Sequence, residues 1–442
     1  MSNTTYDTTT ELRDRAILVS LVTDAVKRTG VDPEHSLQEL VLLAETADVE
    51  VLDVIRQNRE TPDSKWFIGK GKVEELRMAA DGLGANTAIF DQELSGAQVR
   101  NLEEALDLKI IDRTQLILDI FAGRAKTREG IIQVELAQLS YLLPRLSGHG
   151  KNLSRLGGGI GTRGPGESKL ETDRRHIRDR ISELKRQLDE VVKTRNLHRE
   201  RRRKSGTIQV ALVGYTNAGK STLLKQLTDA DVYIQNQLFA TLDPTSRVLE
   251  LPGGKEVVLT DTVGFIQNLP HDLVAAFRAT LEEVNEANLV LHVVDASSEM
   301  RDEQMQVVQK ILEELGAGGK PQIVLFNKTD LCPPEQLEML PAGEGYLKIS
   351  AFRPEDLERI KNAIQEQLVG DTLLFRIPAE RGDLSSLLYR VGEVLEQNFE
   401  GNDMLFDVRL NRDDYAKWEY MLRDFVDPNS PDQLNQNEAG DQ

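Results

Sequence analysis

A glycine loop of eight residues, Gly214–Ser221, places the strongest constraint on how this chain can fold. Its sequence, GYTNAGKS, has the form G-x-x-x-x-G-K-S and directly follows an apolar run over Ile208–Val213. A strand, a glycine loop and a helix in this order form the phosphate-binding loop of P-loop nucleotide hydrolases. We therefore expect a helix over Ser221–Thr228 that presents its positive amino end to a bound anion.

Each residue of this loop has an expected role. Gly214 and Gly219 allow backbone N–H groups to turn inward around phosphates, Lys220 contacts the β- and γ-phosphate oxygens, and Ser221 offers its hydroxyl to Mg²⁺. The other loop positions predicted to line the nucleotide are Tyr215, Thr216, Asn217 and Ala218.

Two of the downstream motifs identify the nucleotide further. DTVG ends the apolar run Val257–Thr260, so that Asp261 can hold Mg²⁺ through water and the Gly264 N–H can sense a γ-phosphate. NKTD ends the run Ile323–Phe326, and Asp330 can accept two hydrogen bonds from a guanine edge. The predicted nucleotide contacts in these motifs are Asp261, Thr262, Val263, Gly264, Asn327, Lys328 and Asp330.

The tripeptide Ser350-Ala351-Phe352 follows a further apolar run, Leu347–Ile349. Its backbone N–H groups could donate to the guanine carbonyl oxygen. A site that hydrogen-bonds a substrate N–H rejects an analogue lacking it by about 10⁴-fold or more. Because the motifs occur in this order and each stands at a strand end, they together predict a GTPase.

The segment FATLDPT, between the phosphate loop and DTVG, is the candidate switch. A switch needs a threonine that reaches Mg²⁺ while γ-phosphate is present; Thr241 is the first choice and Thr245 the alternative. The switch residues predicted to contact the nucleotide are Phe239, Ala240, Thr241, Leu242 and Asp243. We assign the metal to Ser221 and Thr241, and the catalytic roles to Lys220, Thr241 and Gly264.

Two positions bear on the rate of hydrolysis. Phe265 follows DTVG where some GTPases carry a water-orienting glutamine, so slow hydrolysis without a partner is expected. Asn217 stands where GTPases that use K⁺ in place of an arginine finger carry asparagine. A turn-favouring asparagine explains Asn217 equally well, so K⁺ is a candidate second cation.

The pattern of the whole chain predicts an α/β fold: a P-loop GTPase domain with a mainly parallel sheet, preceded by a small α/β domain and a long two-helix arm, and followed by a small α/β appendage. The expected units are residues 1–14, disordered; 15–125, an N-terminal α/β domain; 126–204, the arm; 205–370, the GTPase domain; 371–427, the appendage; and 428–442, a disordered acidic tail.

The arm is predicted as two helices, over residues 131–146 and 168–203, joined by a glycine-rich loop. This loop contains G-x-G-x-x-G at Gly159–Gly164, but no strand precedes it, so a dinucleotide site is rejected. Lys151, Arg155 and Arg163 could contact rRNA phosphates, and an unstructured linker is the alternative. For the short GKGK sequence at 69–72, a structural turn is favoured over a phosphate cradle.

In the appendage, strands are expected over Leu373–Pro378 and Met404–Leu410, and helices over Leu384–Gln397 and Arg412–Arg423.

Charge is distributed unevenly. The chain of 442 residues carries a net charge of −19, but residues 145–204 contain 18 Lys or Arg against 8 Asp or Glu, a net charge of +10 that leaves −29 on the remainder. A basic arm on an acidic body can bind RNA locally, although a solvated helix of mixed charge would look similar. The single cysteine, Cys332, excludes an internal disulfide and suits the cytosol. No apolar run is long enough to span a membrane.

Long strings of the sequence resemble the HflX-type ribosome-associated GTPases. Besides the GTPase motifs, the resemblance includes WFIGKGKVEEL at Trp66–Leu76, the stretch Ile110–Leu139 and GGGIGTRGPGESKLETDRR at Gly157–Arg175, and it covers about residues 15–370. It implies binding to the large ribosomal subunit and its rRNA, and splitting or rescue of ribosomes under stress.

We therefore predict a cytoplasmic, Mg²⁺-dependent GTPase that converts GTP to GDP and phosphate, acts as a monomer and binds no DNA. Peripheral membrane association is an alternative location. The rival function is a GTP-gated protein–protein scaffold without direct rRNA contact, which the acidic body would suit.

Overall fold

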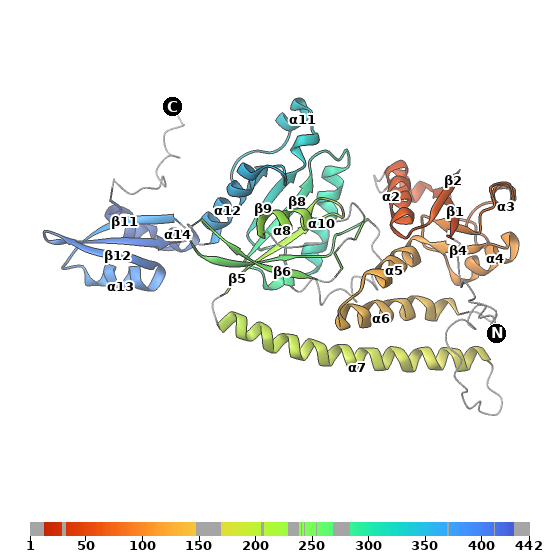
Figure 1. Ribbon diagram of the computed structural model, residues 1–442, viewed down its shortest axis with the longest axis horizontal. Helices are drawn as coiled ribbons and strands as arrows, with labels where there is room; N and C mark the ends of the chain where they lie inside the picture. The colour runs from red at the N-terminus through yellow and green to blue at the C-terminus, as the bar shows by residue number, and fades with distance from the viewer. Residues whose placement is uncertain are drawn as a thin grey trace, which may run out of the picture.

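The computed structural model describes residues 13–28, 32–146, 169–204, 207–228, 238–239, 241–242, 244–252, 254–267, 283–368, 371–410 and 412–427. Three units follow one another along the long axis of the molecule (Figure 1): the N-terminal domain, the GTPase domain in the middle and the C-terminal appendage. The helical arm lies beneath the first two. None of the helices in these ranges combines the length and the apolar run needed to cross a bilayer.

The N-terminal domain is built on a parallel sheet with the strand order β2-β1-β3-β4. Its strands are β1 (Arg15–Val22), β2 (Glu50–Asn58), β3 (Thr87–Phe90) and β4 (Lys109–Asp112). Its helices are α1 (Asp24–Arg28), α2 (Pro33–Thr46), α3 (Lys70–Leu83), α4 (Gly96–Leu106) and α5 (Arg113–Arg124).

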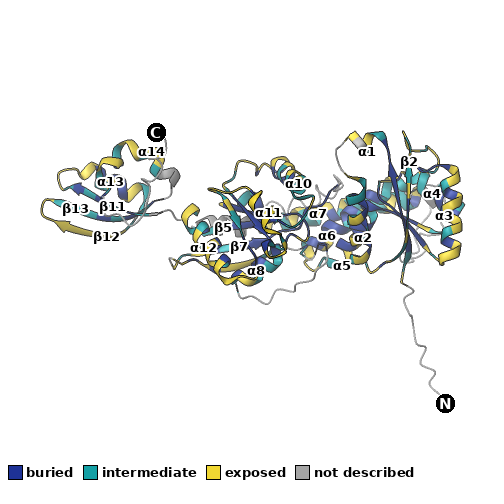
Figure 2. Ribbon diagram, turned by 90° about the horizontal axis from the view of Figure 1, so that it is seen from above, coloured by how far each residue is buried: buried dark blue, intermediate teal, exposed yellow. Residues whose placement is uncertain are grey.

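The side chains of β1 alternate between two apolar cores, one on each face of this sheet. Ile17 and Val19 pack with α3 and α4, whereas Ala16 and Leu18 belong to the core that includes α2 and α5. Figure 2 shows the centre of the sheet as buried ribbon, with exposed residues on α3 and α4 and mostly buried or half-buried residues on α2, which faces the GTPase domain.

The arm consists of α6 (Arg128–Arg145) and α7 (Lys169–Lys204). Apolar contact between them centres on Ile132, Leu136 and Leu184. The 36 residues of α7 give a helix about 54 Å long at the α-helical rise. It passes beneath both the N-terminal and the GTPase domain (Figure 1).

The GTPase domain contains a sheet of order β10-β9-β8-β5-β7-β6, parallel except for the pairing of β6 with β7. Its strands are β5 (Ile208–Gly214), β6 (Thr245–Glu250), β7 (Glu256–Asp261), β8 (Leu289–Asp295), β9 (Gln322–Asn327) and β10 (Tyr346–Lys348). Its helices are α8 (Lys220–Thr228), α10 (Arg301–Glu314), η2 (Thr329–Leu331), α11 (Pro334–Glu338) and α12 (Pro354–Leu368).

Helices cover both faces of this sheet. Leu223 of α8 and Ile360 of α12 share a core with strand residues such as Leu212, while Val308 of α10 packs in the core that reaches into the N-terminal domain. This is the mainly parallel P-loop fold that the sequence predicted.

The C-terminal appendage is an antiparallel sheet of order β11-β13-β12. It comprises β11 (Asp371–Pro378), α13 (Gly382–Val391), β12 (Glu393–Glu400), β13 (Asp403–Leu410), α14 (Arg412–Leu422) and η3 (Arg423–Phe425).

The prediction of one helix over Leu384–Gln397 was wrong beyond Val391. Gly392 ends α13, and the chain returns as β12. A left-handed Gly401, with φ of 66°, then turns the chain into β13. The pairing with β13 outweighs the helical pattern because it puts Val394 against the apolar core around Phe406.

Candidate nucleotide-binding site

The loop after β5 has the backbone that phosphate binding requires. Gly214 has φ of 153°, and a Cβ there would lie 2.2 Å from the carbonyl oxygen of Val293. Gly219 has φ of 99°, and its Cβ would lie 2.3 Å from Nδ2 of Asn327. Only glycine fits at these two places, and the loop leads directly into the amino end of α8.

Lys220 is buried at the mouth of this loop, with 6% of its surface exposed. Its Nζ donates to the carbonyl oxygens of Gly214, at 3.1 Å, and of Tyr215, at 2.9 Å. Burial lowers the pKa of Lys220 to about 8, and the nearby Asp261 acts in the opposite direction. A cation held by carbonyl dipoles alone is a strong attractor for an anion.

Three oxygen atoms converge beside Lys220. Ser221 Oγ lies 2.7 Å from Thr241 Oγ1, and both hydroxyls donate to Asp261 Oδ2, at 2.6 and 2.8 Å. Asp261 Oδ1 is buried and has no hydrogen-bond partner among the described residues. Burial raises the pKa of Asp261, against the effects of Lys220 and the two hydroxyls. Hard oxygen donors around an unsatisfied carboxylate oxygen fit Mg²⁺.

The two candidate switch threonines lie in different places. Thr241 supplies the third oxygen of this cluster, whereas Thr245 is the first residue of β6, opposite Asp261 in the strand ladder. Within the described ranges there is no group of three or more His, Cys, Asp or Glu side chains that could hold a metal ion, so this candidate cation site depends on one carboxylate and two hydroxyls.

The DTVG segment lies directly against the phosphate loop. A Cβ on Gly264 would come within 2.9 Å of Thr216 Cα and 3.1 Å of Lys220 Nζ, so the Gly264 backbone faces the position expected for a γ-phosphate. Phe265 exchanges backbone hydrogen bonds with Gly214 and Thr216, and its side chain is only 1% exposed. Phe265 therefore belongs to the core and cannot touch an attacking water.

Asn327 holds three strand ends together. Its Nδ2 donates to the carbonyl oxygen of Ala218 at 2.9 Å, and its Oδ1 accepts the N–H of Ala351 at 3.0 Å. The neighbouring Lys328 pairs with Asp295 at 2.7 Å. Asp330 is exposed in η2, where a guanine edge could reach it.

The predicted backbone donors for guanine are already engaged within the protein. The Ser350 N–H donates to Asp356 Oδ2 at 2.9 Å, and the Ala351 N–H donates to Asn327. A guanine carbonyl would therefore compete with Asn327 Oδ1 for the Ala351 N–H. Phe352, 71% exposed, stands beside this position.

Several predicted contacts lie elsewhere or outside the described residues. The side chains of Phe239 and Leu242 are buried in an apolar cluster with the N-terminal domain, so only their backbones could face a nucleotide. Ala240, Asp243 and the basic loop residues Lys151, Arg155 and Arg163 lie outside the described residues.

One contact of the phosphate loop has no signal in the sequence. The hydroxyl of Tyr215 donates to Glu39 of the N-terminal domain at 2.5 Å. These residues are 176 positions apart, and no motif links them.

Comparison with known families agrees with this geometry. Residues 34–122 match a family described as GTP-binding GTPase N-terminal, residues 124–202 the GTP-binding GTPase middle region, and residues 209–328 a family described as 50S ribosome-binding GTPase.

Relatives named GTPase HflX match along most of the chain. The protein of Caldanaerobacter subterraneus subsp. tengcongensis is 51% identical over 391 residues, 88% of this chain and 89% of the relative. That of Alkalihalophilus pseudofirmus is 50% identical, covering 86% and 90%. The Escherichia coli protein is 44% identical, covering 83% and 87%.

Among solved structures, a GTP-binding protein of Sulfolobus solfataricus in complex with GDP is 23% identical. It covers 79% of this chain and 98% of its own, with a TM-score of 0.43.

Proposed function

The chain belongs to the HflX family of GTPases, and from that premise we propose that it binds the large ribosomal subunit and splits or rescues ribosomes under stress. The observation that carries the proposal is that one chain combines a phosphate loop, with Ser221, Thr241 and Asp261 gathered beside it, and a long basic arm. We propose that the protein works as a cytoplasmic monomer.

The residues around the phosphate loop divide the chemistry of GTP hydrolysis among them. Lys220 and the amides at the start of α8 bind the phosphate oxygens and offset the charge that develops on them. Ser221 and Thr241, with Asp261 behind them, would hold Mg²⁺, which when bound neutralises phosphate charge. The Gly264 N–H would detect the γ-phosphate. Asp330 would select guanine.

Hydrolysis without a partner should be slow because Phe265 is buried where a water-orienting glutamine would be needed. The deficit should resemble the loss of a catalytic group, about 10³–10⁵-fold. We propose that the ribosomal partner completes the site by ordering Thr241 and its neighbours or by supplying a group in trans.

Asn217 supports a second proposal, that K⁺ sits against the phosphates. Its side chain is exposed on the loop and its backbone is left-handed, with φ of 60°. That backbone by itself favours asparagine, so an alanine variant would mix strain with loss of the ligand. Asn217→Gly removes the side chain and keeps the backbone accessible.

Single-turnover hydrolysis should be compared in K⁺ and in Na⁺, with and without ribosomal subunits. A faster rate in K⁺ that Asn217→Gly abolishes supports a K⁺ site. Equal rates in both salts contradict it, and a fast rate without any partner contradicts the argument from Phe265.

The ribosomal proposal is supported by the charge and exposure of the arm. Residues 145–204 carry a net charge of +10, and the described part of α7 exposes most of its side chains. Some of its arginines are neutralised within the arm, such as Arg180 by Glu135 and Arg195 by Glu129. We propose that the net positive charge of the arm attracts phosphate groups of rRNA.

Co-sedimentation with large subunits, with and without a non-hydrolysable GTP analogue, tests the ribosomal proposal. Binding that requires the triphosphate state supports it. Replacing Lys151, Arg155 and Arg163 together by alanine should lower the salt slope of binding by up to about 2–3 units and leave GTP binding unchanged.

A matched control removes three positive charges from the GTPase domain, at Lys310, Arg353 and Lys361, and should lower the slope less. If the salt slope of subunit binding is unchanged when Lys151, Arg155 and Arg163 are replaced, the loop serves only as a linker. That result would favour the rival function, a GTP-gated scaffold for proteins.

A further inference from the structure

The N-terminal domain carries a buried polar network at the carboxyl edge of its sheet. Arg113, at the start of α5, binds Asp91 at 2.8 Å and also pairs with Glu39 of α2. Ser36 donates to the same Asp91 at 2.8 Å. Both terminal nitrogens of Arg113 are thus engaged, and they hold the Glu39 carboxylate at the surface that meets the GTPase domain.

The hydroxyl of Tyr215 connects this network to the segment that follows DTVG. The backbone N–H of Gln267 donates to Tyr215 Oη at 2.7 Å. Because an N–H can only donate, the phenol uses its own hydrogen for Glu39, at 2.5 Å. The hydrogen bonds therefore run in one direction, from Gln267 to Tyr215 to Glu39.

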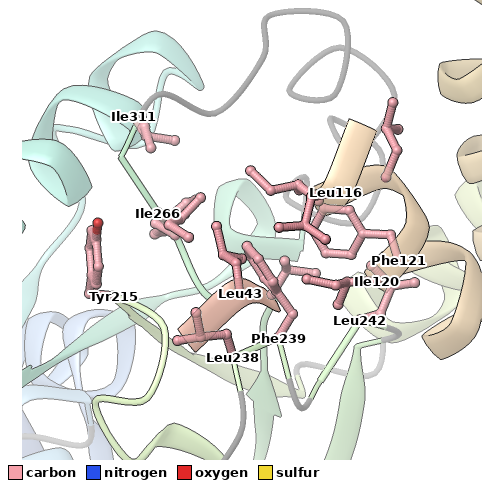
Figure 3. Close-up of a cluster of buried hydrophobic side chains, with 14 of the residues drawn as sticks. Leu43, Leu116, Ile120, Phe121, Tyr215, Leu238, Phe239, Leu242, Ile266 and Ile311 are labelled. Atoms are coloured by element: carbon pink, nitrogen blue, oxygen red, sulfur yellow. The ribbon is translucent and has the colours of Figure 1, made fainter. Parts of the chain in front are cut away.

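A second contact joins the same two domains at the switch segment. The rings of Phe121 and Phe239 have centroids 4.6 Å apart and are tilted by 56°, and both are buried. Leu238 donates its N–H to Thr46 Oγ1 at 3.3 Å. Figure 3 shows Phe239, Leu238 and Leu242 pointing toward Leu43, Ile120 and Phe121.

These contacts occur with the switch closed over the candidate metal site. Phe239 is two residues before Thr241, whose hydroxyl lies within 2.8 Å of both Ser221 and Asp261. Phe239 adopts a left-handed backbone, with φ of 54°, which is uncommon for a bulky residue and persists only where packing holds it. The N-terminal domain provides that packing.

We propose that Glu39, Tyr215 and Phe121 are positioning residues for the GTP reaction. Through Tyr215–Gln267 and Phe121–Phe239 the N-terminal domain holds both switch segments in the arrangement that accepts Mg²⁺ and a γ-phosphate. Docking of this domain and binding of the triphosphate therefore stabilise each other.

The coupling follows from thermodynamic linkage. A ligand shifts an equilibrium only by its differential affinity for the two states. GDP has no γ-phosphate for Gly264 or for the closed switch, so it gains little from docking. The triphosphate makes these contacts, so docking of the N-terminal domain raises its affinity. Binding of the triphosphate favours docking by the same free energy, because the coupling is reciprocal.

Tyr215→Phe tests the proposal most directly because it removes one oxygen and leaves the phosphate loop backbone intact. It leaves Glu39 Oε1 without the phenol donor, while Arg113 still binds the other oxygen, and it leaves the Gln267 N–H without its acceptor. We expect affinity for a non-hydrolysable GTP analogue with Mg²⁺ to fall about 10-fold, as for a hydrogen bond to a charged group, while GDP affinity changes much less. Single-turnover hydrolysis should show the loss mainly in the nucleotide concentration needed for half-maximal rate.

The matched control is Tyr141→Phe. Tyr141 of α6 is also a buried tyrosine, and its hydroxyl bonds to Asp112 within the N-terminal domain. Its loss should leave the ratio of GTP-analogue to GDP affinity unchanged. An equal change of that ratio in both variants would overturn the proposal, as would an unchanged ratio in Tyr215→Phe.

Substitutions of Glu39 separate hydrogen bonding from packing. Glu39→Leu should lower the ratio at least as much as Tyr215→Phe, because it removes the same hydrogen bond and also the pair with Arg113. Adding Tyr215→Phe to Glu39→Leu should then cost much less than Tyr215→Phe costs alone, because the shared hydrogen bond is already gone. Glu39→Gln keeps an acceptor oxygen and should recover part of the ratio. Additive effects in the double variant would show that Glu39 and Tyr215 act independently and would contradict the proposal. These measurements need no ribosome.

Discussion

The N-terminal domain and the GTPase domain are both α/β domains with mainly parallel sheets and polar residues at the carboxyl edges, yet the polar residues of the two edges are paired differently. At the N-terminal edge the buried cation, Arg113, is paired with two carboxylates, Asp91 and Glu39. At the GTPase edge Lys220 rests on backbone carbonyls and Asp261 Oδ1 has no partner among the described residues. Ligands bind at this edge of such sheets, and a buried cation that lacks a carboxylate hydrogen bond makes the GTPase edge the candidate for an anionic ligand.

The largest expected effect concerns Asp330, at the GTPase edge. Asp330→Asn should shift the preference between GTP and XTP by roughly 10⁴-fold, because xanthine offers a carbonyl where guanine offers an amino group. Equilibrium binding of GTP and XTP to both forms measures this. Glu335→Gln, a nearby exposed carboxylate in α11, is the control and should not alter the preference. If Asp330→Asn leaves it unaltered too, Asp330 is not the guanine contact.

At the N-terminal edge the corresponding experiment is Arg113→Met. Removing the cation leaves Asp91 and Glu39 buried without a partner for their charge, which should destabilise the protein by about 3–5 kcal/mol. Urea unfolding measures the loss. Arg186 of α7 also binds two carboxylates, but it is exposed, so Arg186→Met should change stability little. Similar results for both arginines would refute a structural role for the buried network.

Acid should affect the two sheets differently. His292 is buried in β8, where burial lowers its pKa to about 4, and its Nδ1 lies 3.0 Å from the amide nitrogen of Gln322. The unfolded histidine binds its proton near pH 6.5. Between pH 6.5 and 4 the unfolded state therefore holds more protons, and stability falls as pH falls, by about 3 kcal/mol in total.

Strands β1–β4 contain no histidine, so the GTPase sheet should lose stability first. Unfolding at pH 7 and pH 5 should be measured for the wild type and for His292→Asn, which keeps an acceptor oxygen. The same acid loss in both forms would show that other groups dominate.

The smallest expected change in stability is the one that best separates the two sheet edges. Lys220→Met should abolish tight GTP binding, yet raise the stability of the nucleotide-free protein by about 1 kcal/mol, because it removes a buried charge that lacks a carboxylate hydrogen bond. Denaturation without nucleotide and a GTP-binding assay test the two halves. A loss of stability as large as that of Arg113→Met would mean that both edges are structural.

The folds of the individual units were largely predictable because their signals are local. The glycines at positions 214 and 219 belong to a motif of eight consecutive residues, so the sequence revealed them although the atoms that a Cβ would meet belong to Val293 and Asn327. Apolar runs marked β5, β7, β8 and β9. In the appendage the same approach missed β12, because its pairing with β13 outweighs the helical pattern that continues past Gly392.

By itself the sequence determined the family, the P-loop fold and a candidate set of nucleotide contacts, because loop geometry and strand ends are properties of short segments. Only the tertiary structure decided where Phe239 and Tyr215 point. Their partners, Phe121 and Glu39, lie far away along the chain, and no local backbone preference encodes such a pairing. It arises when the apolar faces of two domains are buried together.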